Sequence, residues 1–121
     1  MSRFVMIDRD RTMMQEVGLA CFERGIGVVL AENVCEAVRA LSTTSVSLIV
    51  ADAALLRLTP AEHAAMFARV APSANVVVVV NPDTPLEGRV AYEAVGFRAL
   101  TRPVTAQDLL KEVALAEAWR W

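Results

Sequence analysis

The chain has 121 residues, of which 55% are hydrophobic, and its formal net charge is −2. A chain of this length and composition can bury a core without disulfides or metal, and it is too apolar to be a disordered segment. Its longest apolar runs fall far short of the roughly 20 residues that span a bilayer, and the N-terminus lacks a signal-peptide pattern. We therefore expect one cytoplasmic domain over residues 1–121 with no membrane contact.

Neither the positive charges nor the cysteines indicate a nucleic-acid-binding, redox-active or metal-binding protein. Lys occurs once, at Lys111, and the arginines are scattered without a basic block, which argues against nucleic acid as a direct partner. Cys21 and Cys35 have neither the C-x-x-C spacing of a redox site nor metal-ligand spacing. We expect both to be buried, reduced thiols within helices.

Strand-like and helix-like patterns alternate from one end of the chain to the other. In chain order the expected elements are a strand at Phe4–Ile7, a helix at Arg11–Arg24, a strand at Gly27–Leu30, a helix capped by Asn33 and running through Leu41, a strand at Val46–Ala51, a helix at about 60–70, a strand at Val76–Val80, a helix at about 85–95, a strand at Ala99–Thr101 and a helix from Thr105 towards Trp119.

Two of these helices begin with the same sequence device. Thr59-Pro60-Ala61-Glu62 and Thr84-Pro85-Leu86-Glu87 place Thr at the N-cap, Pro at the first helical position and Glu at the third. Thr and Glu side chains can each accept a hydrogen bond from a backbone N–H of the other, and Pro has no N–H to leave unpaired. Both threonines are predicted to cap their helices.

The alternation predicts an α/β fold of the flavodoxin-like, doubly wound (βα)5 type. Helices between strands imply right-handed crossovers and a parallel sheet covered on both faces, with strand order 2-1-3-4-5. The five consecutive valines of Val76–Val80 suit a strand inside such a sheet. In folds of this kind the functional crevice lies at the carboxyl ends of the strands.

Charged side chains are expected to gather at that edge. Asp8 follows the first strand, Asp52 follows the third and Arg102 follows the fifth. Two carboxylates at neighbouring strand ends suit Mg²⁺, which binds through one or two carboxylates plus phosphate oxygens. An Asp can also attack a phosphoryl donor and become an aspartyl phosphate.

Over its whole length the chain resembles the receiver domains of response regulators. Phe4-Val5-Met6-Ile7-Asp8 resembles the first strand and first acid of that family, and Ser47–Asp52 resembles the third strand with its phosphoacceptor Asp52. Leu100-Thr101-Arg102-Pro103 resembles the family's Lys-Pro step, and Val104–Leu110 the helix start after it. The resemblance implies a signalling module of two-component phosphorelays, not an enzyme.

The chain also departs from the family pattern. Arg9 stands where a second acid is usual, Asp10 is acidic but one position late, and Arg102 replaces the Lys. The hydroxyl residue that ends the fourth strand falls on Val80 or Asn81, neither of which has a hydroxyl, and the aromatic switch position aligns near Ala99.

These departures predict a pocket held by ion pairs instead of by a metal. Arg9 and Arg102 are the expected pocket cations, Asp8 and Asp10 the acidic residues, and any Mg²⁺ on Asp8 and Asp52 is expected to bind weakly or not at all. The first interpretation is therefore an atypical receiver that acts through protein contacts. The alternative is a conventional receiver phosphorylated on Asp52.

A third interpretation, from another class, is a small flavodoxin-like ligand-binding protein or enzyme. It requires a phosphate-cradling loop after the first strand, and Asp8-Arg9-Asp10-Arg11-Thr12 is acidic and contains no Gly. His63, the only histidine, has no Ser, Cys or second His placed to partner it, and we expect it on the surface of its helix.

The resemblance also implies partners: a histidine kinase, a phosphotransfer protein or an output protein. Receivers dock or dimerise through the face of their fourth helix, fifth strand and fifth helix, which here spans about Leu86–Trp121. Leu86, Val90 and Tyr92 are the candidate apolar contacts on it. Trp119 and Trp121 either pack the last helix on the domain or belong to a segment that leads away from it.

Overall fold

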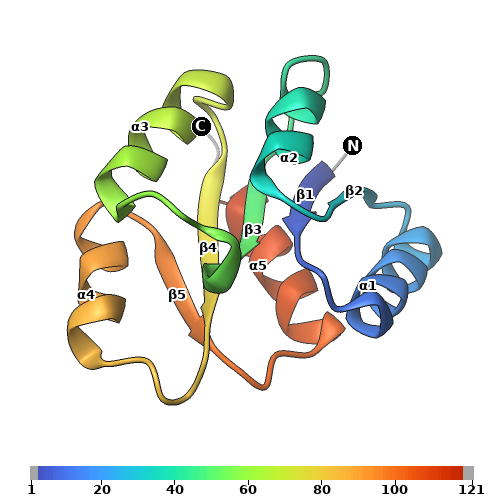
Figure 1. Cartoon of the computed structure of the whole chain (residues 1–121). Coiled ribbons are helices and arrows are strands. Elements are labelled where there is room, and N and C mark those ends of the chain that lie inside the picture. Colours follow the sequence, from blue (N-terminus) through green and yellow to red (C-terminus); the bar gives the residue numbers. More distant parts are fainter. Residues whose placement is uncertain (1–2, 119–121) are drawn as a thin grey trace.

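The computed structural model describes residues 3–118, and its strands form one parallel sheet. The elements are β1 (Arg3–Ile7), α1 (Arg11–Arg24), β2 (Gly27–Ala31), α2 (Val34–Leu41), β3 (Leu48–Asp52), the short 3-10 helix η1 (Ala53–Leu55), α3 (Pro60–Val70), β4 (Asn75–Val80), α4 (Leu86–Ala94), β5 (Arg98–Thr101) and α5 (Ala106–Ala118). The sheet order is β2-β1-β3-β4-β5 with every neighbouring pair parallel. The expected (βα)5 fold and strand order are confirmed (Figure 1).

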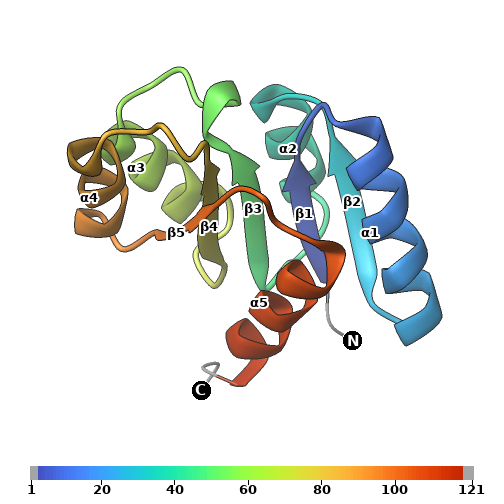
Figure 2. The ribbon, with the colours of Figure 1, turned by 90° about the horizontal axis from the view of Figure 1, so that it is seen from below.

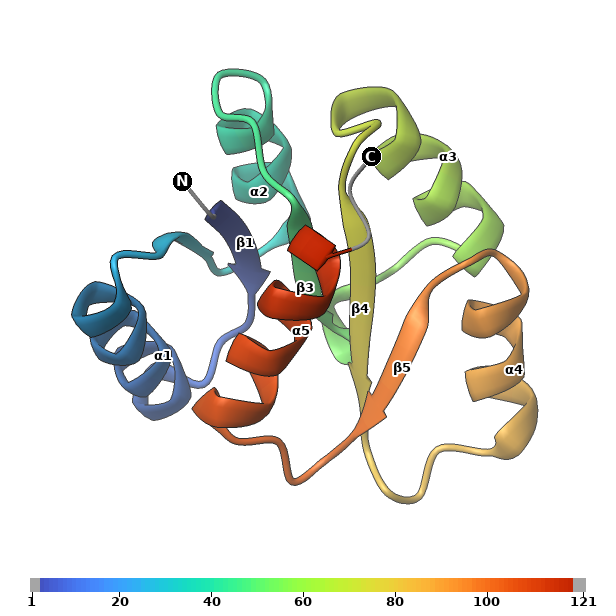
Figure 3. The same ribbon diagram turned by 180° about the vertical axis from the view of Figure 1, so that it is seen from behind.

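Helices cover both faces of the sheet, and each face has its own hydrophobic core. On one face, Met14 and Val17 of α1 and Leu109 and Val113 of α5 pack against alternate residues of the central strands. The other face carries α2, α3 and the half-buried Tyr92 of α4. Figures 2 and 3 show α5 on the opposite side of the sheet from α3. This three-layer arrangement leaves the two ends of the strands as the places where loops meet.

The valine run forms an inner strand of the sheet, as predicted. β4 lies between β3 and β5, and its residues from Val76 to Val80 are all buried. Odd- and even-numbered valines enter different core clusters because side chains alternate across a strand. β4 therefore needs apolar side chains on both faces.

Side-chain caps fix the starts of several helices. The hydroxyl of Thr59 accepts a hydrogen bond from the Glu62 N–H at 3.2 Å, and the Glu62 carboxylate accepts one from the Thr59 N–H at 3.0 Å. This confirms the predicted capping box of α3. Thr105 and Asp108 exchange the same pair of bonds at the start of α5, a box that the sequence analysis missed because Asp takes the place of Glu.

The predicted cap at Thr84 is wrong. α4 starts at Leu86 with Pro85 as its N-cap residue, and no side-chain hydrogen bond caps it. Thr84 therefore lies one position before the N-cap, and its N–H donates to the Asn81 carbonyl in a turn at 3.0 Å. The preceding turn, which the Thr-Pro-x-Glu pattern cannot reveal, shifts the helix start by one residue.

One cysteine also departs from expectation. Cys21 is buried on α1, but Cys35 is exposed on the first turn of α2, because the apolar stripe that packs on the sheet passes through Ala37 and Leu41 instead. Trp119 and Trp121 lie outside the described residues. Among residues 3–118, no helix is both long enough and apolar enough to cross a bilayer.

The two threonines provide a matched test of capping. Replacing Thr59 with Ala removes the hydroxyl that accepts from the Glu62 N–H, and we expect the free energy of unfolding to fall by about 0.5–2 kcal/mol. Replacing Thr84 with Ala removes no cap and should change it by no more than about 0.5 kcal/mol. Urea denaturation of both variants measures the difference, and equal losses would contradict the assignment.

Candidate functional site

Three charged side chains meet at the carboxyl edge of the sheet. Asp8 directly follows β1, Asp52 is the last residue of β3, and Arg102 directly follows β5. The parallel register aligns Ile7 with Ala51, and the Arg102 N–H donates to the Val80 carbonyl at 2.9 Å. Strands from distant parts of the sequence therefore end side by side and place their side chains in one crevice.

Asp8 is the buried member of this group, with 5% of its surface exposed. Its Oδ1 accepts hydrogen bonds from the backbone N–H groups of Arg9 at 2.7 Å and Asp10 at 3.0 Å. Its Oδ2 lies 3.4 Å from Nη2 of Arg102. A buried carboxylate needs such partners because desolvation without them is costly.

Asp52 is engaged in a similar way but is more exposed. Its Oδ1 accepts from the Ala54 N–H at 3.0 Å, which starts η1, and its Oδ2 lies 3.2 Å from Nη2 of Arg102. One fifth of the Asp52 side chain remains open to solvent. Of the two carboxylates, Asp52 is thus the one that a reagent reaches from outside.

Arg102 joins the two acids through a single nitrogen. Nη2 contacts both Asp8 and Asp52, so the guanidinium bridges the ends of β1 and β3 from its place after β5. One positive charge faces two carboxylates, and three backbone N–H groups supply the remaining polar contacts. A guanidinium keeps its charge at any working pH, so a change of pH does not discharge the cation of this bridge.

Arg9 does not belong to the ion-pair cluster, and the prediction that it is a pocket cation is wrong. Its Nε donates to the backbone carbonyl of Glu32 at 3.3 Å, at the end of β2. Within residues 3–118 no ion pair joins Arg9 to Asp8 or Asp52. The reason is local: the Arg9 N–H bonds to the carboxylate of Asp8, and its exposed side chain leaves the crevice.

The other sequence-predicted residues have structural roles or lie apart. Asp10 caps α1, with its Oδ1 accepting from the Met13 N–H at 3.1 Å. Val80 is buried at the end of β4, and Asn81 is exposed in the following turn. Ala99 lies within β5. No hydroxyl side chain therefore occupies the end of β4 beside Asp52.

The donor set does not fit a divalent cation as it stands. Both oxygens of Asp8 and both oxygens of Asp52 already accept from an N–H group or contact the Arg102 guanidinium. The third acid, Asp10, is turned to the start of α1. In the part of the chain that the structure describes, no group of three His, Cys, Asp or Glu side chains could hold a metal ion. A bound ion would have to displace Arg102.

His63 was expected on the surface, but it is buried, with 2% of its surface exposed. It stacks on Phe67, and its Nε2 accepts a hydrogen bond from the Leu58 N–H at 3.0 Å. This bond ties the loop after η1, which follows Asp52, to α3. The missed signal was the spacing of His63, Phe67 and Val70, which places His63 on the apolar face of its helix.

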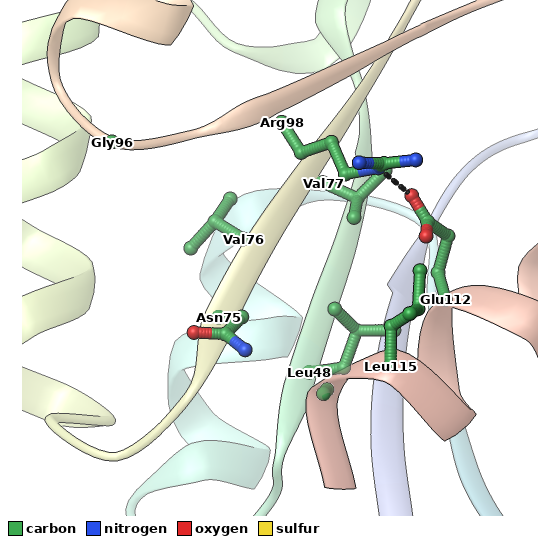
Figure 4. A pocket seen from close by; sticks show the side chains of 9 residues that line it. Leu48, Asn75, Val76, Val77, Gly96, Arg98, Glu112 and Leu115 are labelled. Atoms are coloured by element: carbon green, nitrogen blue, oxygen red, sulfur yellow. Dashed lines mark hydrogen bonds and ion pairs between the residues drawn. The ribbon is translucent and has the colours of Figure 1, made fainter. Parts of the chain in front are cut away.

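A second hollow lies at the opposite end of the sheet, where β3, β4 and β5 begin. It has a volume of about 420 Å³ and is lined mainly by apolar side chains, including Leu48, Val77 and Leu115. Figure 4 shows the Arg98–Glu112 ion pair at its rim, with Glu112 buried and Arg98 largely exposed. Because it lies far from the strand ends that carry Asp8 and Asp52, it is not part of the acidic crevice.

Comparisons with known proteins bear on the fold. No family model and no curated protein sequence matches the chain. Among solved structures, the chain is similar to a response regulator of Burkholderia pseudomallei with a phosphorylated aspartic acid, with 19% identity, a TM-score of 0.76 and coverage of 98% of this chain and 72% of that one. It is also similar to the beryllofluoride-activated NtrC4 receiver domain dimer, with 17% identity, a TM-score of 0.80 and coverage of 96% of each chain. A third similar structure is the chemotaxis response regulator CheY4 of Vibrio cholerae, with 19% identity, a TM-score of 0.77 and coverage of 96% of this chain and 98% of that one.

This chain has the receiver fold. The likeness extends over nearly the whole chain in each comparison, although fewer than one residue in four is identical. The receiver fold accounts for the position of the crevice, since it sets which strand ends lie together. The chemistry of the crevice has to be argued from its own residues.

The buried histidine makes stability depend on pH. Burial lowers the pKa of His63, and the nearby Glu62 carboxylate offsets part of this effect. The folded chain then binds fewer protons at this site than the unfolded chain, so the free energy of unfolding should fall as pH drops below about 6.5. Thermal melts between about pH 5 and pH 7 measure this.

The matched control is His63→Gln, whose side-chain oxygen can still accept from the Leu58 N–H but does not titrate. We expect its stability to be flat over the same pH window, because the pKa values of Glu62 and Asp108 are lowered and these acids titrate only in more acidic solution. An equal slope in both proteins would show that His63 is not the responsible group.

Proposed function

We propose that this chain is an atypical receiver module of two-component signalling, in which Arg102 takes the place of a metal ion between Asp8 and Asp52. The supporting observation is the position of Nη2 of Arg102, at 3.4 Å from one carboxylate and 3.2 Å from the other. In this proposal Asp52 occupies the phosphoacceptor position but has its oxygens engaged, so that phosphorylation is weak or absent.

The proposed module acts through protein contacts in the cytoplasm and not as an enzyme. Its partners are signalling proteins: a histidine kinase, a phosphotransfer protein or an output protein. The structural support is that the crevice offers no free nucleophile and base pair, since both acids are tied to Arg102 and His63 is buried against Phe67.

The face of α4, β5 and α5 is the proposed docking surface for such a partner. On α4, Leu86 and Val90 lie one turn apart and are both exposed, Leu86 by 74%. Tyr92 is half-buried and packs near Phe97, so it contributes less to this surface than the sequence suggested. A homodimer through the same face is the other expectation from the sequence. It is distinguished from partner docking by sedimentation of the chain alone, in which Leu86→Glu should dissociate a dimer formed through this face.

The principal alternative is a conventional receiver phosphorylated on Asp52. In its favour, Asp52 is partly open to solvent, and the similar Burkholderia pseudomallei protein carries a phosphorylated aspartic acid. In this alternative, a divalent ion and a phosphoryl group displace Arg102 from the carboxylates.

A flavodoxin-like ligand-binding protein or enzyme has less support. Such a site would use free backbone N–H groups after β1 to cradle a phosphate. Here the N–H groups of Arg9 and Asp10 are already donated to the Asp8 carboxylate. An anion at this loop would also face that carboxylate at close range, and like charges repel.

The ion-pair proposal is tested by magnesium binding. In the native chain we expect weak Mg²⁺ binding by calorimetry and little labelling of Asp52 by a small acyl phosphate. Arg102→Gln releases both carboxylates and should raise Mg²⁺ affinity by about tenfold or more, because a positive charge within about 4 Å of the ion is removed.

Arg9→Gln is the matched control, because it also removes a guanidinium from the edge of the crevice, but one that bonds to the Glu32 carbonyl and contacts neither carboxylate; the Arg9 backbone N–H bond to Asp8 is kept. Its effect on Mg²⁺ affinity should be much smaller. Asp52→Asn controls for labelling at other residues. Tight Mg²⁺ binding by the native chain, or ready labelling at Asp52, would overturn the proposal in favour of the conventional receiver.

A further inference from the structure

The sheet has two edge strands, β2 and β5, and only β5 carries residues that hinder pairing with a further strand. β2 forms one edge, and its five residues, Gly27 to Ala31, include no charge, no proline and no polar side chain. β5 forms the other edge, begins with Arg98 and is followed by Arg102-Pro103. Natural sheets block exposed edges with charges, prolines or bulges, because an open edge is a template for another strand. β2 has none of these devices.

The outward backbone groups of β2 are those of Val28 and Leu30. The Asp8 N–H donates to the Ala31 carbonyl at 3.0 Å, so Ala31 faces β1. Backbone groups alternate along a parallel strand, which turns Val29 and Gly27 to β1 as well. The N–H and carbonyl groups of Val28 and Leu30 therefore point away from the sheet, toward solvent or a partner.

Apolar side chains continue this open edge on one face of the sheet. Phe22 and Leu19 of α1 are exposed by 84% and 62%, and Leu30 of β2 by 41%. Gly18, which precedes Leu19 on α1, lies close to Leu30, because a Cβ atom added to it would be 3.9 Å from the Leu30 side chain; α1 therefore lies beside this strand residue. Figure 2 shows α1 beside β2 at one end of the sheet, and α4 at the other end. We call Leu19, Phe22 and Leu30 the α1–β2 patch.

We propose that a second copy of this chain docks on this edge, with its β2 antiparallel to the first. With the two Val29 residues opposite each other on a twofold axis, Val28 of one copy faces Leu30 of the other. These are the two residues whose N–H and carbonyl groups point outward, and each such pair exchanges two hydrogen bonds. The edge is therefore complementary to itself, as a twofold interface requires.

The twofold axis also brings the two α1–β2 patches together. An axis perpendicular to the sheet keeps α1 of both copies on the same face, so Phe22, Leu19 and Leu30 of one copy approach those of the other. Backbone hydrogen bonds then form beside an apolar contact that excludes water. An exposed apolar patch next to an open strand edge is thus covered by a single partner.

Charge favours the antiparallel direction. Arg24 ends α1 before β2 begins, and Glu32 follows β2 at its other end, where Arg11 pairs with it at 3.2 Å. Antiparallel copies place the Arg24 end of one β2 beside the Glu32 end of the other, whereas parallel copies place like charges side by side. To pair across the interface, Arg24 exchanges its hydrogen bond to Gln107, which measures 2.9 Å, for one to Glu32 of the second copy. A partner strand of unrelated sequence would not have this match built in.

The test is the oligomeric state in sedimentation velocity over a range of concentrations. The native chain should form a dimer, and Phe22→Glu should weaken its dissociation constant by about tenfold or more, because it places two carboxylates at the apolar contact. Leu86→Glu is the matched control: it replaces an equally exposed apolar residue on α4 and should leave the dimer intact. Far-ultraviolet circular dichroism checks that both variants fold.

Amide hydrogen exchange gives a residue-level readout. The amides of Val28 and Leu30 should exchange more slowly as the chain dimerises, while the Val29 amide, which faces β1, should be protected at every concentration. A strict monomer at high concentration overturns the proposal. So does a dimer that Leu86→Glu dissociates and Phe22→Glu does not, since that result assigns the contact to α4. Neither result bears on Mg²⁺ binding at Asp52, so the two proposals fail independently.

Discussion

The guanidinium of Arg102 holds together the candidate site at the carboxyl edge of the sheet. It enters the crevice from the end of β5 and contacts carboxylates at the ends of β1 and β3, so three strands share one ion-pair cluster. Two carboxylates brought close together repel each other and need a compensating positive charge. Arg102 supplies one positive charge to the pair, and three backbone N–H groups supply further hydrogen bonds.

This arrangement has a consequence for the loops. Asp8 holds the start of the β1–α1 loop through two backbone N–H groups, and Asp52 holds the start of η1 through one. Any ligand that draws Arg102 away removes the cation from both carboxylates at once, and these carboxylates hold the starts of both loops. His63 acts on the same segment from the other side, because its bond to the Leu58 N–H fixes the loop that follows η1. The β3–α3 connection is therefore held at its two ends by groups of different chemistry.

The sequence was sufficient for the fold because the fold depends on periodicity and order. Five valines in a row, capped helices between apolar runs and the absence of long loops leave few topologies other than a parallel sheet with order 2-1-3-4-5. It also placed Asp8, Asp52 and Arg102 at one edge, since this needs only the knowledge of where strands end. The same reasoning located Thr59 as a cap, where the helix start depends on local residues alone.

What the sequence could not predict are the directions of individual side chains. Arg9 is adjacent to Asp8 in sequence, yet its own N–H bonds to that carboxylate and its side chain reaches Glu32. Thr84 repeats the pattern of Thr59, yet the turn from Asn81 moves the start of α4 past it. In both cases a backbone hydrogen bond that spans only a few residues decides the outcome, and composition and spacing carry no information about it.

The two edge strands of the sheet, β5 and β2, differ in how they are connected to the ion-pair cluster of Asp8, Asp52 and Arg102. β5 is followed directly by Arg102, whose guanidinium contacts both acids, so the ion-pair cluster is joined to the chain segment between β5 and α5. β2 itself carries no residue of the ion-pair cluster, but the Asp8 N–H donates to the Ala31 carbonyl, and Arg9 reaches the Glu32 carbonyl just after the strand. In the proposed dimer, the β2 contact is connected to the ion-pair cluster through Asp8, whose N–H bonds to Ala31. The α4–β5–α5 face is connected to the same cluster through Arg102, which directly follows β5.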